Sequence, residues 1–134
     1  MSQIIQVAQN TVCVIGGHES YPSLLAREYD VRRSCLLIDL SSAIVSEKSL
    51  MSIGREAFGV GHINNYIYAV AGVNEDYKSE TSMERYDLST DKWCFMPNAE
   101  FDKFTEHISL IVSAKRYLLA FGGNWVGGGM FYPT

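Results

Sequence analysis

Three short apolar runs, each closed by a pair of small residues, recur along the chain. The closing pairs are Gly16-Gly17, Ala71-Gly72 and Gly122-Gly123, and the second members of these pairs are 55 and then 51 positions apart. Runs of β-branched and aromatic residues that end at glycine are typical of buried strands followed by a tight turn. Positive φ costs little only for glycine, which gives the pairs a physical cause. We therefore expect repeated units of about 50 residues, each built from strands.

Each unit is expected to contain more strands than the one that ends at glycine. A further apolar segment and a polar turn precede each run, which predicts a hairpin. In the middle unit, Tyr86-Asp87 and Trp93 flank the polar stretch 89–92, which predicts a second hairpin. The strands of this unit are therefore expected at about 57–63, 66–71, 82–88 and 92–96.

The combined pattern resembles the kelch repeat, in which a small-residue pair ends the second strand, a Tyr-Asp lies in the third and a Trp in the fourth. The resemblance implies an all-β fold, a partial kelch-type β-propeller built of four-stranded antiparallel blades. We expect the large aromatic residues of the third and fourth strands to fill the wedge between neighbouring blades. The residues that carry the motif are Gly16, Gly17, Gly72, Tyr86, Asp87, Trp93, Gly122 and Gly123.

The repeat also predicts how the chain is divided. One domain over 1–134 is expected to consist of blade one at about 1–53, blade two at about 54–103 and an incomplete blade three at about 104–134. Blade one has Val45 where blade two has Trp93. The Tyr-Asp of the third unit would fall beyond the last residue, so the third and fourth strands of that blade are expected to be missing. Further blades from a longer parent or another chain are then expected to complete the ring.

Composition and charge argue against several classes of protein. A net charge of -4, with no basic cluster beyond Arg32-Arg33, argues against a nucleic-acid surface. No apolar run approaches the roughly 20 residues of a membrane span, so no membrane insertion is expected. Cys13, Cys35 and Cys94 lack metal-ligand spacing. We expect three small buried thiols in a reducing compartment, and therefore a cytoplasmic protein.

The sequence predicts no catalytic residue, no cofactor and no metal site. Gly127–Gly129 is not followed by the Lys-Ser/Thr of a phosphate-binding loop, so a flexible loop is expected there. The histidines stand at different offsets from their glycine pairs and do not recur at one position of the repeat. Asp39 and Asp87 follow the repeat and are expected to accept hydrogen bonds within hairpin turns.

The remaining candidate for function is the loop surface. In the kelch family, partners commonly bind the loops that join second to third strands and one blade to the next. The resemblance therefore implies a non-catalytic protein-protein interaction module that recruits a protein or peptide, as kelch ubiquitin-ligase adaptors and cytoskeletal scaffolds do. Aromatic and charged side chains of these loops are the kind that anchor interfaces. The candidates are Tyr21, Arg27, Glu75, Tyr77, Lys78 and Trp125.

The alternative is a fragment of a kelch-propeller enzyme, such as a sialic-acid epimerase-like isomerase. Polar residues of such an enzyme would converge on the central tunnel of the propeller. Arg55, His62 and His107 lie near the expected inner strands and are the residues that would serve it. A BTB or F-box domain in a parent sequence would favour the adaptor, whereas a signal peptide before a lone propeller would favour the enzyme.

Overall fold

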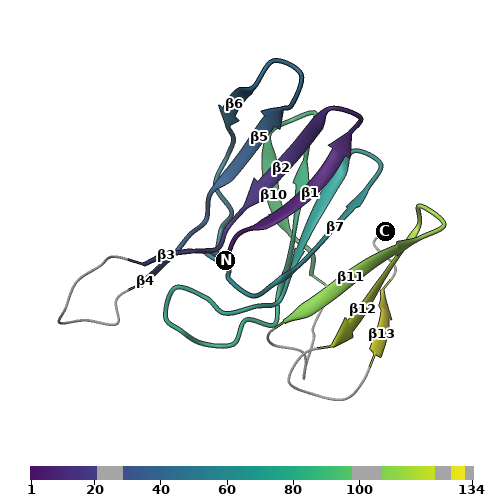
Figure 1. Cartoon of the computed structure of the whole chain (residues 1–134). Coiled ribbons are helices and arrows are strands. Elements are labelled where there is room, and N and C mark those ends of the chain that lie inside the picture. Colours follow the sequence, from purple (N-terminus) through teal and green to yellow (C-terminus); the bar gives the residue numbers. More distant parts are fainter. Residues whose placement is uncertain (21–28, 98–106, 123–127, 132–134) are drawn as a thin grey trace.

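The computed structural model describes residues 1–20, 29–97, 107–122 and 128–131, and these residues form three antiparallel sheets and a short ribbon (Figure 1). The predicted all-β fold with four-stranded antiparallel blades is confirmed. The first sheet has the order β1 (Gln3–Ala8), β2 (Thr11–Ile15), β5 (Cys35–Asp39), β6 (Ile44–Glu47). The second has the order β7 (Gly59–Ile63), β8 (Tyr66–Val70), β9 (Met83–Asp87), β10 (Lys92–Phe95). The third has the order β11 (Ile108–Ser113), β12 (Tyr117–Gly122), β13 (Gly128–Phe131). In these ranges no helix is long and apolar enough to cross a membrane.

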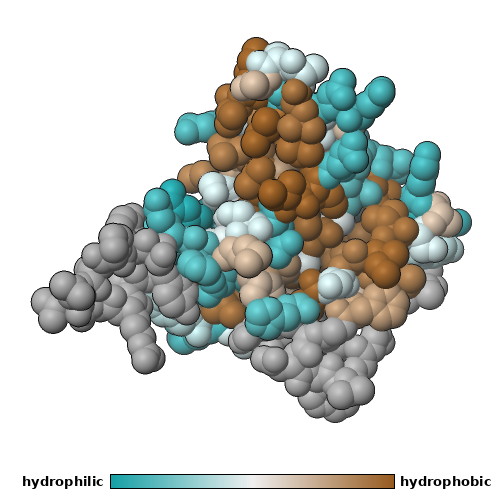
Figure 2. Space-filling model, viewed as in Figure 1, coloured by the Kyte–Doolittle hydropathy of each residue, from teal (hydrophilic) through white to brown (hydrophobic). Residues whose placement is uncertain are grey.

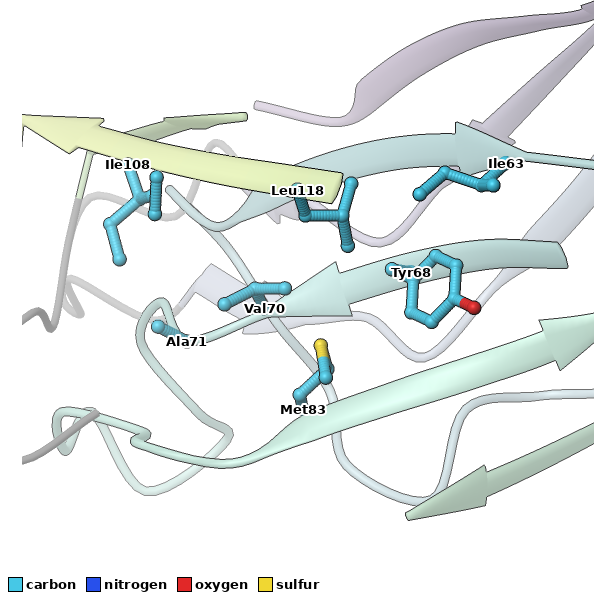
Figure 3. Close-up of a cluster of buried hydrophobic side chains, with 8 residues drawn as sticks. Ile63, Tyr68, Val70, Ala71, Met83, Ile108 and Leu118 are labelled. Atoms are coloured by element: carbon cyan, nitrogen blue, oxygen red, sulfur yellow. The ribbon is translucent and has the colours of Figure 1, made fainter. Parts of the chain in front are cut away.

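The second sheet lies between the other two and is covered on both faces. Successive side chains of a strand point to opposite faces, so a strand covered on both sides is apolar along its whole length. Strand β8 fits this rule, since Ile67 and Ala69 belong to a buried cluster with the first sheet, whereas Tyr68 and Val70 belong to one with the third. Figure 3 shows the second cluster, with side chains of the third sheet lying against those of β8. The core therefore sits between the sheets, as in neighbouring propeller blades.

The first two small-residue pairs turn the chain where it passes close to residues 55 and 56, in the segment that leads into the second sheet. Gly72 has a φ of +99°, and a Cβ added there would lie 2.5 Å from the carbonyl oxygen of Glu56. Gly16 has a φ of +55°, and its added Cβ would lie 2.6 Å from the carbonyl oxygen of Arg55. Both positive φ and close backbone approach exclude larger side chains. The ends of these two strands are therefore fixed by sterics that favour glycine, and at the place of Gly16 the second pair has Ala71 with a φ of +59°.

The aspartates of the third strands cap the following turns, as the sequence predicts. Asp39 Oδ1 accepts hydrogen bonds from the backbone N–H of Ser41 and of Ser42. Asp87 Oδ1 accepts them from the backbone N–H and the hydroxyl of Ser89. Hydrogen bonds to the carboxylate lower the pKa of both aspartates. Each hairpin is thus closed by an Asx turn.

The third sheet corrects the expectation that its third strand is missing, whereas no fourth strand is found among the described residues. Strand β13 pairs with β12 along its length, with Leu118 opposite Phe131 and Phe121 opposite Gly128. The predicted loop at Gly127–Gly129 is therefore wrong for its last two residues, which lie in a strand. The error came from carrying over the loop length of blade two, because only five residues, 123–127, separate β12 from β13. Pairing with β12 overrides the low strand propensity of glycine.

Two smaller features also differ from expectation. The segment 18–34, which the sequence predicts as the loop between the second and third strands of blade one, is not simply a loop, because β3 (His18–Ser20) and β4 (Tyr29–Val31) form a two-stranded antiparallel ribbon. Of the three cysteines, Cys13 and Cys35 are buried as predicted, but Cys94 is exposed. Strand β10 is the outer edge of its sheet, so one of its faces is open to solvent.

A carboxylate in the β9–β10 turn joins the second sheet to the segment that precedes it. Asp91 Oδ1 accepts hydrogen bonds from the backbone N–H of Ser49, at 2.9 Å, and from the hydroxyl of Tyr86, at 2.7 Å. These hydrogen bonds, that of Ser49 foremost, lower the pKa of Asp91 from its ordinary value of 3.8. The folded state therefore favours the ionised form of Asp91.

The stability of the chain is expected to depend on Asp91 in acid. Because the pKa is lower in the folded state, the stabilisation is present above the ordinary value and is lost as pH falls through the folded value. Thermal unfolding of the wild type and of Asp91→Asn, followed between about pH 2 and pH 7, measures this contribution. The difference in Tm between the two proteins should be largest near neutral pH and should shrink in acid. A difference that does not change with pH would contradict the assignment.

Candidate interaction surface on the loop face

Three segments meet at one end of the first two sheets and together form the part of the loop face that the structure describes. They are the β3–β4 ribbon with the residues that follow it, the connection 48–58 between the first and second sheets, and the β8–β9 loop at 71–82. Backbone hydrogen bonds join the first two, from Met51 N–H to the carbonyl of Arg33 and from Gly17 N–H to that of Arg55. A pair of hydrogen bonds between Glu56 and Val73 joins the second to the third. The surface is therefore held by main-chain contacts.

An open groove of about 330 Å³ lies on this surface. Across it, Arg33 Nε lies 3.2 Å from Glu75 Oε1, and both side chains are nearly half exposed. Beside it, Arg32 forms an ion pair with Glu19 of β3. Leu50, 60% exposed, adds an apolar side chain to the rim. The lining residues are Asp30, Val31, Arg32, Arg33, Ser34, Leu50 and Glu75.

The β8–β9 loop presents the predicted residues Glu75, Tyr77 and Lys78 as exposed side chains. Asn74 organises this loop, because its Oδ1 accepts hydrogen bonds from the backbone N–H groups of Asp76 and Lys78. Tyr77 has a φ of +58° and is 50% exposed. A non-glycine residue at positive φ is uncommon, and here the asparagine turn holds it. The loop therefore has a defined conformation before any partner binds.

The structure brings together only part of the predicted set. Glu75 lines the groove itself. Tyr77 and Lys78 come two and three residues after Glu75 in the same loop and do not line the groove. Tyr21, Arg27 and Trp125 lie outside the described residues, as does Gly123 of the motif set. Their place relative to the groove stays a prediction.

Comparison with known proteins agrees with this architecture. A family model described as Kelch motif matches residues 54–99. The chain is 32% identical over 120 residues to Kelch-like protein 15 of Gallus gallus and to that of Danio rerio, and 31% identical to that of Homo sapiens. It belongs to the kelch-repeat family. The match covers 85% of this chain but 22% of the Gallus gallus protein and 18% of the other two, so the chain spans about a fifth of the length of these relatives.

In this kelch chain, the sequence predicts the segment 18–34, which carries the basic side of the groove, as a partner-binding loop. It does not single out Arg32 and Arg33 within that segment as residues that anchor a partner. Their position became meaningful only when β4 placed them opposite the β8–β9 loop, with Arg33 facing Glu75. The adjacent pair of arginines directly after an apolar valine was the one available signal. Nothing in the sequence indicated that Leu50 would stand at the same rim.

Arg55, which the kelch pattern places at the start of an inner strand, lies beneath this surface. Its side chain and that of Glu84 are fully buried, with Arg55 Nη2 3.3 Å from Glu84 Oε2. Glu84 Oε1 also accepts a hydrogen bond from the backbone N–H of Ser52, at 2.7 Å. The pair therefore fixes the connection 52–55 against the second sheet.

The residues of the alternative, enzymatic interpretation do not form a site on this surface. Arg55 is enclosed and donates hydrogen bonds to the carbonyls of Ala71 and Ser82. His62 Nε2 is buried without a hydrogen-bond partner among the described residues. His107 is exposed ahead of β11, where its backbone N–H donates to the carbonyl of Ala57. In the described ranges, no group of three or more His, Cys, Asp or Glu side chains is placed to hold a metal ion.

Proposed function

We propose that this kelch segment is a non-catalytic interaction module that recruits a protein or peptide partner through its loop face. The observation that carries the proposal is the groove between β4 and the β8–β9 loop, with Arg33 and Glu75 across it. Kelch propellers are in general protein-interaction modules, which supports this use of the surface. An adaptor or scaffold role in the cytoplasm is the corresponding cellular function.

The chemistry of the groove favours a short polar segment with one apolar side chain. Arg33 and Glu75 are each close to half exposed, so a partner can reach both charges. A carboxylate of the partner can compete with Glu75 for the planar guanidinium group, which binds carboxylates through two parallel hydrogen bonds. Leu50 gives an apolar contact at the same rim. We therefore propose an acidic peptide with a neighbouring apolar residue as the ligand class.

The rigidity of the surface supports binding without a large ordering cost. Ion pairs on an exposed surface contribute little to folding, about 0–1 kcal/mol, so exchanging one for a contact with a partner costs the fold little. The hydrogen bonds from Met51 and to Asn74 hold the two walls in place. Less conformational entropy is lost on binding when the walls are ordered beforehand.

A peptide library displayed on phage and selected on the wild-type chain tests the proposal. Arg33→Ala and Tyr77→Ala in the chain are each expected to weaken its binding of the selected peptides about tenfold or more. The reason is that anchors of an interface contribute at least about 1.4 kcal/mol. Lys92→Ala is the matched control, because it removes an exposed charge from the outer strand β10. Binding measured by isothermal titration with synthesised peptides gives the comparison.

Two results would overturn the proposed binding face. One is that the selected peptides bind Arg33→Ala and Tyr77→Ala with unchanged affinity but no longer bind Lys92→Ala. The other is protection from hydrogen exchange on peptide binding that falls on the outer strands β6 and β10, at 44–47 and 92–95, and not on the segments around the groove.

A further inference from the structure

The two arginines that line the groove are already paired with carboxylates of the chain itself. Arg33 pairs across the groove with Glu75, and Arg32 pairs with Glu19 of β3. Both arginines directly follow β4, whereas their partners belong to β3 and to the β8–β9 loop. Figure 2 shows hydrophilic residues gathered at the β3–β4 ribbon and hydrophobic residues over the strands of the first sheet. The charged groups that a partner meets at the groove are therefore occupied in the free chain.

The charges of the groove cancel one another. Among the described residues that line it, Arg32 and Arg33 are positive, and Asp30 and Glu75 are negative. Equal numbers of positive and negative groups in one place give no strong field that would draw a charged partner from a distance. A carboxylate of a partner therefore gains affinity through direct hydrogen bonds to a guanidinium group.

The β8–β9 loop and the connection 48–58 hold Glu75 in its place. Asn74, the residue before it, accepts hydrogen bonds from two backbone N–H groups of the loop. Beneath the glutamate lies Gly54, where an added Cβ would be 2.8 Å from Glu75 Cγ and 2.8 Å from the carbonyl oxygen of Val31. The stem of the glutamate thus lies against the connection. Because its backbone is already ordered, Glu75 loses less conformational freedom when it pairs with the arginine.

We infer that Glu75 is an internal competitor for Arg33, which the carboxylate of a partner displaces when it binds. The inference rests on the proposed function of the groove and adds to it a residue that determines specificity. The two side chains are 48% and 43% exposed, and ion pairs between exposed groups are weak, so Glu75 can leave the arginine. Glu75 therefore lowers the affinity for acidic peptides, although its exposure alone would suggest an anchor of the interface.

Competition also predicts which carboxylates bind. In the free chain, Arg33 Nε lies 3.2 Å from one oxygen of Glu75. A ligand that offers only one such contact replaces the contact that it displaces. A carboxylate that approaches in the plane of the guanidinium group forms two parallel hydrogen bonds and so gains over the glutamate. Glu75 thereby selects for carboxylates that can take this planar arrangement.

The two roles of Glu75 predict opposite signs in a binding experiment. An acidic peptide selected by phage display on the wild type is synthesised and titrated calorimetrically into the full chain and its variants. Glu75→Gln is expected to raise the affinity about three- to fivefold, the size of an exposed ion pair, whereas Arg33→Ala lowers it about tenfold or more. An anchor at Glu75 would instead make Glu75→Gln weaken binding.

Asp76→Asn is the matched control. Asp76 is the next residue of the same loop, is exposed and carries the same charge, but it does not line the groove. Its substitution should leave the affinity within about twofold, because only the loss of the charge at Glu75 frees a guanidinium group. Circular dichroism confirms that each variant is folded.

A change in the peptide provides a second measurement. Each acidic residue of the peptide is replaced in turn by its amide. The carboxylate that contacts Arg33 should be worth more in Glu75→Gln than in the wild type, because in the variant it displaces no charged competitor.

The outcomes separate this inference from the proposed function. If Arg33→Ala weakens binding but Glu75→Gln weakens it or leaves it unchanged, the groove binds the peptide and Glu75 is not a competitor. An equal gain from Asp76→Asn would also overturn the inference, since the effect would then be one of net charge. If no acidic peptide is selected, or if Arg33→Ala has no effect, the proposed ligand class and the inference fail together.

Discussion

Replacing Arg55 by methionine is expected to lower the free energy of unfolding by about 3–5 kcal/mol. The substitution leaves the carboxylate of Glu84 fully buried without the cation that faces it at 3.3 Å. Removal of one partner of a buried ion pair is costly because the remaining charge can no longer reach water. Burial lowers the pKa of Arg55, and the attraction to Glu84 opposes this shift. The attraction to Glu84 therefore favours the charged form of Arg55 inside the protein.

The guanidinium group also donates hydrogen bonds to Ala71 and Ser82. Its Nη1 donates to the carbonyls of Ala71 and Ser82, at 2.9 and 3.0 Å, and its Nη2 donates to the hydroxyl of Ser82 at 2.7 Å. The loss of these buried hydrogen bonds adds to the cost of the substitution. Methionine fills much of the volume of arginine, so the measured effect reports charge and hydrogen bonding more than a cavity.

Urea denaturation of a double-mutant cycle measures this contribution. Arg55→Met and Glu84→Gln are compared with the double variant, which is expected to be more stable than the sum of the single losses predicts, since no unpaired charge remains. Arg33→Met is the surface control, and its exposed pair with Glu75 should contribute about 1 kcal/mol or less. A loss below about 1 kcal/mol for Arg55→Met would contradict the structural role given to the pair.

Truncating Tyr86 to alanine is expected to cost about 3–5 kcal/mol, the usual range for a large aromatic side chain in a core. The ring is fully buried between the first two sheets, 5.1 Å from that of Trp93. Its hydroxyl donates to Asp91, so the substitution also removes a hydrogen bond. Trp93 is half-buried, and its Nε1 donates to the carbonyl of Ser49 at 2.9 Å. A smaller loss is therefore expected for Trp93→Ala than for Tyr86→Ala.

Thermal unfolding of the two core variants beside Tyr77→Ala provides the measurement. Tyr77 is 50% exposed in a loop, and its truncation should change stability by no more than about 0.5 kcal/mol. Tyr86→Phe separates the hydrogen bond from the packing and should cost about 1 kcal/mol. Equal Tm values for Trp93→Ala and Tyr77→Ala would show that the aromatic pair does not hold the first two blades together.

The fold of the repeat could be predicted from the sequence because its signals are local. Glycine is favoured where φ is positive, so the pairs at Gly16 and Gly72 marked the ends of strands without knowledge of their neighbours. The continuous apolar run at 66–70 indicated a strand covered on both faces. Asp39 and Asp87 bond to residues two and three positions away, so their roles in the turns were also visible.

The sequence was less informative where the outcome depended on contacts between distant segments. Strand β13 forms because the edge of β12 that faces away from β11 has backbone groups free to pair. The local propensity at Gly128 disfavours a strand. The partner of Arg55, Glu84, lies 29 positions away and has no signature of its own. Of the groove, the segment 18–34 and the β8–β9 loop were predicted as partner-binding loops, whereas Arg33 was not singled out and Leu50 was not predicted.

The sequence by itself therefore determined the repeat, the turns and the family, because each depends on residues that are close along the chain. Only the tertiary structure decided which side chains share the groove and which faces stay open. Ile111 and Ile4 have the composition of core residues, and periodicity gives their face of the strand but not whether another sheet covers it. Burial is a property of what packs on a face, and the packing partner of a sheet is set by the arrangement of whole sheets.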